Sequence, residues 1–336
     1  MLALVTGALG FLGGQIARRL LGQGYRVRVL TRREAPELAA LGAEVYLGDL
    51  DDFASLLRAT DGVDGVVHSA AKSGVWGPLA QYVENNAMGT ARILEAARQQ
   101  KARYFVYTSS PSVVHAGEDL KGVDESAPYM ADPAQPYAYS KMLAERLVLR
   151  ADCPSFRTLA LRPHLIWGPG DPHLFPRLAA RAKRGRLFLF SGGPYLVDAT
   201  YIDNAAEAHV LALDRLVAGD PVGGLPFFIG QDQPIELTEL INSLLATAGL
   251  GPAKPIINKR LGRAIGFSLE KLWRLAKAVN EPPLTLFTAR QLSSSHYYDL
   301  TRAKTLLGYR PGVSLSEGLR RLTERWANLA AKNNGA

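Results

Sequence analysis

The stretch Thr6-Gly7-Ala8-Leu9-Gly10-Phe11-Leu12-Gly13 determines the fold expected for the first half of the chain. It follows the apolar run 2–5 and opens a helical pattern. In such a context the first glycine of this spacing permits a tight turn, the second lets a pyrophosphate approach the backbone, and the third lets the helix pack on a sheet. Amides at the start of a helix favour phosphate. The stretch therefore predicts a dinucleotide site formed by Gly7, Gly10, Phe11 and Leu12.

Strand and helix patterns alternate through the first 162 residues. Short β-rich runs predict strands at 2–6, 25–31, 44–47, 65–68, 104–109 and 157–162. Longer periodic segments predict helices at 11–23, 34–41, 78–100 and 137–151. This alternation is typical of an α/β fold, here a doubly wound, mainly parallel sheet of the Rossmann type with helices on both faces.

The alternation ends after Arg162, where prolines and glycines mark loops and a basic helix is expected at 177–184. A strand entering a helix at 199–216 has the pattern of the first domain, whereas the remainder is mostly helical. We therefore expect a dinucleotide-binding domain at 1–162, rejoined by 199–216. A smaller, mostly helical substrate-binding lobe would comprise 163–198 and 217–330.

Composition narrows the class of protein. The 336 residues are 47% hydrophobic, enough for a large core, and the net charge of +8 favours anionic partners. The basic residues are scattered and no nucleic-acid-binding motif is present, so we expect no nucleic-acid partner. The six histidines lack metal-ligand spacing, so we expect no metal, and the single cysteine, Cys153, permits no intrachain disulfide. No leader peptide and no membrane-spanning run are evident, which predicts a cytoplasmic protein.

The end of the second predicted strand selects the cofactor. NAD-dependent enzymes usually place an acidic residue there to bind the ribose hydroxyls, whereas this chain has Arg32 and Arg33. Guanidinium groups can neutralise a 2′-phosphate and stack on adenine, so NADP(H) is favoured over NAD. Four further residues are expected along the dinucleotide: Asp49 and Leu50 beside the adenine, and Ala70 and Ala71 where small side chains leave room.

A second motif, Tyr137-Ala138-Tyr139-Ser140-Lys141, carries candidate catalytic groups. Tyr137 and Lys141 are four residues apart and share one helix face, whereas Tyr139 does not face Lys141. A free phenol has a pKa of about 10, and a neighbouring ammonium group favours the phenolate. The hydroxyls that end the fifth strand could bind a substrate carbonyl, with Ser110 the first candidate and Ser109 the alternative. The motif predicts a tyrosine that transfers a proton.

Together these pieces resemble an extended short-chain dehydrogenase/reductase. The matching motifs span most of the chain and include the glycine turn, Asn86 in Asn-Ala-Met-Gly-Thr, Tyr137 with Lys141, and Arg162-Pro163. The resemblance implies that Ser110, Tyr137 and Lys141 are catalytic and that Asn86 supports them. It also implies that Lys141 holds the cofactor ribose and that Pro163 to Leu165 line the nicotinamide.

Within that superfamily, the segments 108–114 and 123–126 resemble the 3β-hydroxysteroid dehydrogenase-like branch. They are most similar to the bacterial 2-alkyl-3-oxoalkanoate reductase family of long-chain olefin biosynthesis. The resemblance implies NADPH-dependent reduction of a long-chain 2-alkyl-3-oxoalkanoic acid to the 2-alkyl-3-hydroxyalkanoic acid. Three alternatives share much of the pattern: a 3β-hydroxysteroid-type dehydrogenase, a sugar-nucleotide epimerase and a non-enzymatic NADP-sensing protein.

The segment 261–279 interleaves apolar and basic residues and fits a lipid substrate. Such a helix can border an apolar tunnel or lie on a membrane surface. We expect the substrate pocket to extend from Ser110 and Tyr137 into 261–292, with Phe267 and Trp273 near its wall. Family resemblance further implies a homodimer through the helices at 78–100 and 137–151, and an assembly with other enzymes of the pathway.

Overall fold

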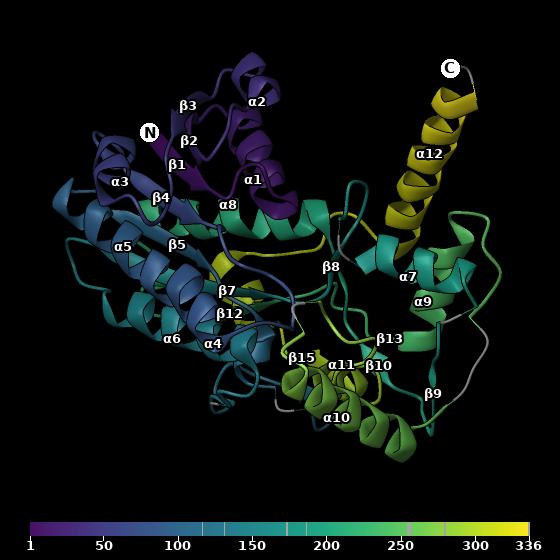
Figure 1. Ribbon diagram of the computed structural model, residues 1–336. Coiled ribbons are helices and arrows are strands. Elements are labelled where there is room, and N and C mark those ends of the chain that lie inside the picture. The colour runs from purple at the N-terminus through teal and green to yellow at the C-terminus, as the bar shows by residue number, and fades with distance from the viewer. Residues whose placement is uncertain are drawn as a thin grey trace.

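A seven-stranded parallel sheet forms the centre of the computed structural model (Figure 1), which describes residues 1–115, 117–130, 132–172, 174–185, 187–253, 257–278 and 280–334. The strand order is β12-β7-β5-β4-β1-β2-β3. The strands are β1 (Leu2–Thr6), β2 (Arg26–Thr31), β3 (Glu44–Leu47), β4 (Gly65–His68), β5 (Tyr104–Thr108), β7 (Arg157–Pro163) and β12 (Pro226–Ile229). The order reverses between β1 and β4, and ligands of such sheets bind at this switch point. The predicted α/β fold is confirmed.

Helices cover both faces of the sheet (Figure 1). One face carries α1 (Phe11–Gly22) and α8 (Ile202–Ala218), and the other carries α3 (Phe53–Thr60), α5 (Gly89–Gln99) and α6 (Pro136–Arg150); α2 (Pro36–Ala40) precedes β3. Successive side chains of β1 point to opposite faces of the sheet and so enter two separate hydrophobic cores. Ala3 and Val5 enter the core under α1 and α8, and Leu2 and Leu4 enter the core under α3, α5 and α6.

Two features of this domain differ from the sequence expectations. The helix expected at 78–100 consists of α4 (Leu79–Tyr82), a π-helical turn η1 (Val83–Met88) and α5, because the side chain of Asn86 is drawn into contacts described below. Strand β12 pairs with β7 at the sheet edge, although it lies within the segment 217–330 that we expected in the lobe.

The lobe is built from short helices and small sheets at one side of the main sheet (Figure 1). Its helices are α7 (Leu174–Lys183), α9 (Leu237–Ala246), α10 (Lys259–Leu275) and α11 (Leu286–Gln291). Two further turns contact the main domain: η2 (Pro111–Val113) contacts α6, and η3 (Ala303–Leu307) contacts α8 and β12. Its strands are β6 (Leu120–Val123), β8 (Ile166–Trp167), β9 (Phe190–Ser191), β10 (Leu196–Val197), β11 (Thr200–Tyr201), β13 (Ile235–Glu236), β14 (Ile257–Asn258) and β15 (His296–Tyr298). Val279 of the predicted segment 261–279 lies outside the described residues. None of the helices in the described ranges combines the length and apolarity that a membrane span needs.

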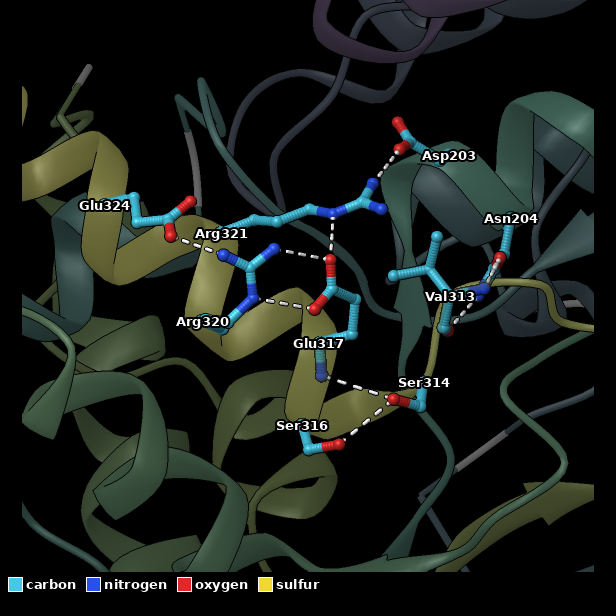
Figure 2. Close-up of polar contacts among 9 residues, drawn as sticks. All are labelled: Asp203, Asn204, Val313, Ser314, Ser316, Glu317, Arg320, Arg321 and Glu324. Carbon is cyan, nitrogen blue, oxygen red and sulfur yellow. Dashed lines mark hydrogen bonds and ion pairs between the residues drawn. The ribbon is translucent and has the colours of Figure 1, made fainter.

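The last helix, α12 (Leu315–Asn334), is fastened to the start of α8 (Figure 2). Arg321 binds Asp203 at 3.0 Å and also donates to Glu317 at 2.6 Å. Just before the helix, the Asn204 side chain donates to the Val313 carbonyl at 2.8 Å and accepts from the Val313 amide at 2.9 Å. These contacts tie the C-terminal segment to a helix that packs on the main sheet.

Candidate active site

The glycine turn after β1 has the geometry of a phosphate cradle. Gly7 has a φ of +71°, and a Cβ there would lie 2.7 Å from the Ala70 amide nitrogen. A Cβ at Gly13 would overlap the Gly7 carbonyl, so the start of α1 packs against the turn itself. Gly10 is exposed and caps α1, which has neither a side-chain cap nor an acidic residue in its first turn. The first amides of α1 are therefore available to an anion, and the residues present fit a dinucleotide pyrophosphate.

Other predicted cofactor residues lie around this turn. Phe11 is partly exposed, whereas the Leu12 side chain is in the core, so only the Leu12 backbone can face a phosphate. Arg32 and Arg33 follow β2, are exposed and form no ion pair with any described residue. Past β3, Asp49 is also exposed and Leu50 packs near Gly89.

The loop after β4 completes this region. Ala70 is partly buried, and its amide donates to the Thr6 hydroxyl at 3.2 Å. Ala71 is exposed and Pro163, which ends β7, is buried. Ala70 and Ala71 thus lie where β1 and β4 diverge, next to the glycine turn.

Tyr137 and Ser110 come together from α6 and the end of β5. Ser110 caps η2, and its Oγ accepts from the Ser112 amide at 3.2 Å. Burial raises the pKa of the Tyr137 phenol above its ordinary value, and a hydrogen bond with Ser110 lowers it only part of the way back. Ser109 is buried, and its hydroxyl has no partner among the described residues. The arrangement favours Ser110 over Ser109 as the neighbour of Tyr137.

Lys141 is buried one helical turn after Tyr137. Its Nζ donates to the Thr108 carbonyl and lies 4.4 Å from the centroid of the Tyr107 ring. Burial lowers the pKa of this ammonium group to about 7. Burial is the largest influence on the pKa of the Tyr137 phenol, and the Lys141 amine is directed to the end of β5, so the lowering of this pKa by Lys141 stays a prediction. The phenol is therefore protonated at neutral pH, the state that a proton donor needs.

Asn86 joins three segments from within the π turn η1. Its Oδ1 accepts from the Lys72 amide at 2.7 Å, and its Nδ2 donates to the Lys72 carbonyl at 3.1 Å and to the Ser140 hydroxyl at 2.9 Å. Ser140 in turn donates to the Tyr137 carbonyl at 2.8 Å. One side chain thus couples the loop after β4 to the first turn of α6. π turns often occur at functional sites.

A buried histidine that sequence analysis did not single out connects the same elements. His68 ends β4, with Nδ1 2.7 Å from the Thr6 hydroxyl and Nε2 3.0 Å from the Thr90 hydroxyl. Burial lowers the pKa of His68 to about 3, so the ring is neutral. Its location at the carboxyl end of a central strand was the available sequence signal.

A buried ion pair also escaped the sequence analysis. Glu145 on α6 accepts from Arg162 of β7 at 2.6 Å, with side-chain exposures of 0% and 2%. The Tyr129 hydroxyl donates to Glu145 at 2.7 Å. This pair holds α6, and with it Tyr137 and Lys141, against the sheet. An arginine in the otherwise apolar run 159–163 was the sequence signal.

A pocket of about 60 Å³ opens at Tyr137. The lobe contributes its far wall, which consists of Glu270 from α10 and Leu286, Phe287 and Arg290 from α11. The pocket includes Tyr137 and residues of 261–292, as expected, but Ser110, Phe267 and Trp273 are not among the residues that line it.

The packing of α10 explains that difference. Its buried positions are Gly262 and Gly266, where a Cβ would overlap the Phe190 ring or lie 2.9 Å from the Thr285 carbonyl. The helix packs on the lobe through its glycines and through the half-buried Ile265, Leu269 and Trp273. Phe267 is on the other side of the helix and is 49% exposed.

Residues 4–260 match the model of the 3-beta hydroxysteroid dehydrogenase/isomerase family. The chain belongs to this family. A "2-alkyl-3-oxoalkanoate reductase" of Stenotrophomonas maltophilia is 44% identical over 96% of this chain and 98% of its own length. A protein of the same name from Shewanella oneidensis is also 44% identical, over 95% of this chain and 85% of its own. The "Sterol-4-alpha-carboxylate 3-dehydrogenase, decarboxylating" of Mus musculus is 32% identical over 97% of this chain and 91% of its own.

A solved structure extends the comparison to the fold. MoeE5 in complex with UDP-glucose and NAD superposes with a TM-score of 0.74 at 26% identity, covering 98% of this chain and 99% of that chain. The family, the fold and the oxidoreductase class predicted from the sequence are therefore confirmed.

Proposed function

We propose that this chain is an NADPH-dependent ketoreductase. It would reduce a long-chain 2-alkyl-3-oxoalkanoic acid to the 2-alkyl-3-hydroxyalkanoic acid in olefin biosynthesis. The observation that carries the proposal is the geometry of Tyr137, which lies beside Ser110 and lines a pocket whose far wall belongs to the lobe. Identity of 44% to two proteins named for this reaction, over nearly the whole chain, supports the substrate.

The side chains around the pocket supply a proton and an oxyanion site. The cofactor, when bound, supplies the hydride that adds to the ketone carbon. Tyr137 gives its phenolic proton to the ketone oxygen, and the Ser110 hydroxyl donates a hydrogen bond to that oxygen. The hydride and the proton together convert C=O to CH–OH. Lys141 carries positive charge below pH about 7 and would bind the cofactor ribose, and Asn86 fixes the first turn of α6.

The remaining proposed site residues would hold the dinucleotide. Amides of the glycine turn and of Phe11 and Leu12 would bind the pyrophosphate, and Pro163 would lie beside the nicotinamide. Asp49 and Leu50 would contact the adenine, and Ala70 and Ala71 would leave it room. The exposed carboxylate of Asp49 and the open first turn of α1 support these assignments.

A preference for NADPH over NADH follows from Arg32 and Arg33. A charge-assisted hydrogen bond to phosphate contributes roughly 1.5–3 kcal/mol, so the 2′-phosphate should raise affinity tenfold or more. Replacing both arginines by alanine should bring the ratio of kcat/KM for NADPH to kcat/KM for NADH close to one. Arg26→Ala, at the opposite end of β2, is the matched control. Equal efficiency with both cofactors in the unmodified protein would contradict this preference.

A cofactor-oxidation assay with three substrate classes tests the reaction itself. We expect NADPH oxidation with 2-alkyl-3-oxo acids, little turnover of a 3β-hydroxysterol with either cofactor, and none of UDP-glucose. Turnover of the sterol or the sugar nucleotide alone would overturn the proposed substrate. NADPH binding without turnover of any ketone would indicate a sensor protein.

We further propose that the protein is a homodimer in the cytoplasm. Helices α5 and α6 pack side by side, and exposed Met88 and Leu147 add apolar surface beside them. A four-helix contact between two copies would cover this surface, and light scattering would give the mass. Cys153 has no disulfide partner, which suits a reducing compartment. A larger assembly with pathway enzymes would be detected by co-purification.

Contact with a membrane surface is the last part of the proposal. The outward side of α10 exposes Leu261, Phe267, Leu272 and Leu275, among Lys259, Lys271 and Lys277. A helix with large apolar side chains among lysines suits the interface of an anionic bilayer. Glu270 of the same helix lines the pocket at Tyr137, so a lipid substrate could enter beside it.

A further inference from the structure

A second cavity, of about 70 Å³, lies in the lobe between α7, α9 and the end of α11. Helices α7 and α9 pack side by side there (Figure 1). Eight of its ten lining residues are aliphatic: Leu165, Leu174, Leu178, Leu237, Leu240, Ile241, Leu244 and Leu292. The other two are Gln291 and His296. We call this cavity the leucine chamber.

The polar groups of the leucine chamber already have partners. His296 Nδ1 lies 3.0 Å from His164 Nε2, and His296 Nε2 lies 2.9 Å from the Gln291 carbonyl. The Gln291 side-chain nitrogen lies 2.6 Å from His115 Nδ1. Burial lowers the pKa of His296, so the ring is neutral. A polar or charged ligand would lose its hydration and gain little in return, whereas an alkyl chain would lose nothing polar.

The chamber has a closed end and an open end. Leu240, Ile241 and Leu244 are almost fully buried, whereas Leu165, Leu174 and Leu292 remain partly exposed. Leu165 stands two residues beyond the carboxyl end of the central strand β7, in the left-handed region with a φ of +39°. Such a conformation is uncommon outside glycine and persists where the surroundings hold it. Of these partly exposed residues, Leu165 lies just beyond the carboxyl end of β7, next to the end of β5 that leads to Ser110.

Helix α11 borders both cavities. Leu286, Phe287 and Arg290 face the pocket at Tyr137, and Gln291 faces the leucine chamber. The two cavities differ in chemistry, because the pocket at Tyr137 also carries Asp132, Glu270 and Arg290 and so offers charged walls of both signs. A ligand with a polar head and two apolar chains could place its head in the pocket at Tyr137 and one chain in the chamber.

We propose that the leucine chamber is an acyl-chain site that takes one of the two alkyl chains of the substrate. This inference rests on the proposed function, whose substrate bears one chain at C2 and another beyond C3. The pocket at Tyr137 then receives the carboxylate and the other chain. Selectivity for the length of one chain is set by α7 and α9, far from the reacting carbonyl.

Variants that fill the chamber test the inference. Leu178→Phe and Leu244→Phe add volume at the rim and at the closed end, and Leu41→Phe is a matched control on the exposed surface. Kcat/KM is measured for two series of 2-alkyl-3-oxo acids, one varying the C2 chain and one varying the other chain. In one series only, we expect the filling variants to have nearly normal kcat/KM for the shortest member. For the longest member of that series, their kcat/KM should be tenfold or more below that of the unmodified protein. Equal losses at all lengths, or no loss in either series, would overturn the inference.

A binding measurement separates this inference from the proposed function. A fluorescent long-chain fatty acid is titrated into the cofactor-bound protein, and both filling variants should weaken its binding about tenfold or more, unlike Leu41→Phe. If the unmodified protein reduces no oxo acid but shows this binding pattern, the proposed function fails and the chamber stands. If it reduces the acids while the fatty acid binds every variant equally, the function stands and the chamber inference fails.

Discussion

At the scale of single residues, burial sets the chemistry of the proposed catalytic pair. The Tyr137 phenol and the Lys141 ammonium group are both shifted toward their neutral forms, because a poorly solvated site disfavours charge. The neutral phenol suits a reductase. The phenol keeps the proton that it must deliver, and the hydroxyl of Ser110 is beside it.

The first prediction concerns proton transfer. Tyr137→Phe keeps the ring and most of its packing but removes the proton, so turnover should fall about a hundredfold or more. NADPH affinity, measured by fluorescence, should stay within a few-fold of the unmodified protein. Tyr139→Phe, two residues along the same helix, is the control and should lower turnover only slightly. Near-normal turnover by Tyr137→Phe would refute the assignment.

The second prediction concerns pH and Lys141. The pKa of Lys141 is about 7 in the folded chain and about 10.5 when unfolded, so between these values the unfolded state binds more protons. Burying this lysine therefore costs most at and below pH 7, and the cost disappears as pH rises toward 10.5. Lys141→Met should be inactive, yet its gain in free energy of unfolding over the unmodified protein should be larger at pH 6 than at pH 9.5.

Urea unfolding at the two pH values measures that difference. Lys101→Met, on the exposed surface, controls for the general effect of removing a positive charge. A gain for Lys141→Met that is the same at both pH values would show that burial does not depress the pKa of this lysine.

At the scale of elements, the short π turn η1 positions the start of α6. It interrupts a helix that would otherwise be continuous from 79 to 99, and it presents Asn86 to the backbone of Lys72 and to Ser140. The start of α6 is thereby fixed to the loop that follows β4, the region proposed to hold the dinucleotide. The position of Tyr137 depends on the start of α6 and on the loop after β4.

The third prediction follows from this arrangement. Asn86→Ala removes three hydrogen bonds of a buried side chain, each contributing about 1 kcal/mol, so the protein should lose roughly 2–4 kcal/mol of stability. Kcat should fall at least tenfold with a smaller change in KM, because the phenol loses its fixed position. Asn85→Ala, whose exposed side chain bonds only the Gln81 carbonyl, is the neighbouring control. Equal effects of the two variants on kcat and on thermal unfolding would argue against a positioning role.

At the scale of the whole molecule, α10 presents its apolar residues to solvent. Packing through Gly262 and Gly266 brings its backbone close to the lobe and leaves Leu272 and Leu275 at 56% and 81% exposure. Exposed apolar surface of this kind is typical of a contact with a partner or a membrane, which we proposed above for α10.

The fourth prediction tests the membrane contact. Burial of a leucine contributes about 1.5–3 kcal/mol, so Leu272→Ser with Leu275→Ser should weaken binding to anionic phospholipid vesicles by tenfold or more. Binding is measured by co-sedimentation at low and high salt, and salt should weaken it because lysines contribute. Leu41→Ser is the control. If the unmodified protein does not sediment with the vesicles, this surface has another partner.

The sequence by itself determined the features that depend on neighbours in the chain. Glycine spacing specified the turn after β1, alternating patterns specified the parallel sheet, and the four-residue spacing placed Tyr137 and Lys141 on one face of α6. Local geometry decides each of these, since backbone conformation and helical periodicity act over a few residues. The family resemblance rests on the same local motifs.

Only the tertiary structure decided what surrounds those residues. Contacts of Asn86 with Lys72 and Ser140, the buried pair Glu145 and Arg162, and the leucine chamber all join segments that are separated along the chain. The outward face of α10 was another such case, because the sequence pattern could not show that glycines would be its packing surface. Burial determines the pKa values of the site residues, and packing determines the cavities. Both depend on the whole folded chain, so no short window of sequence contains them.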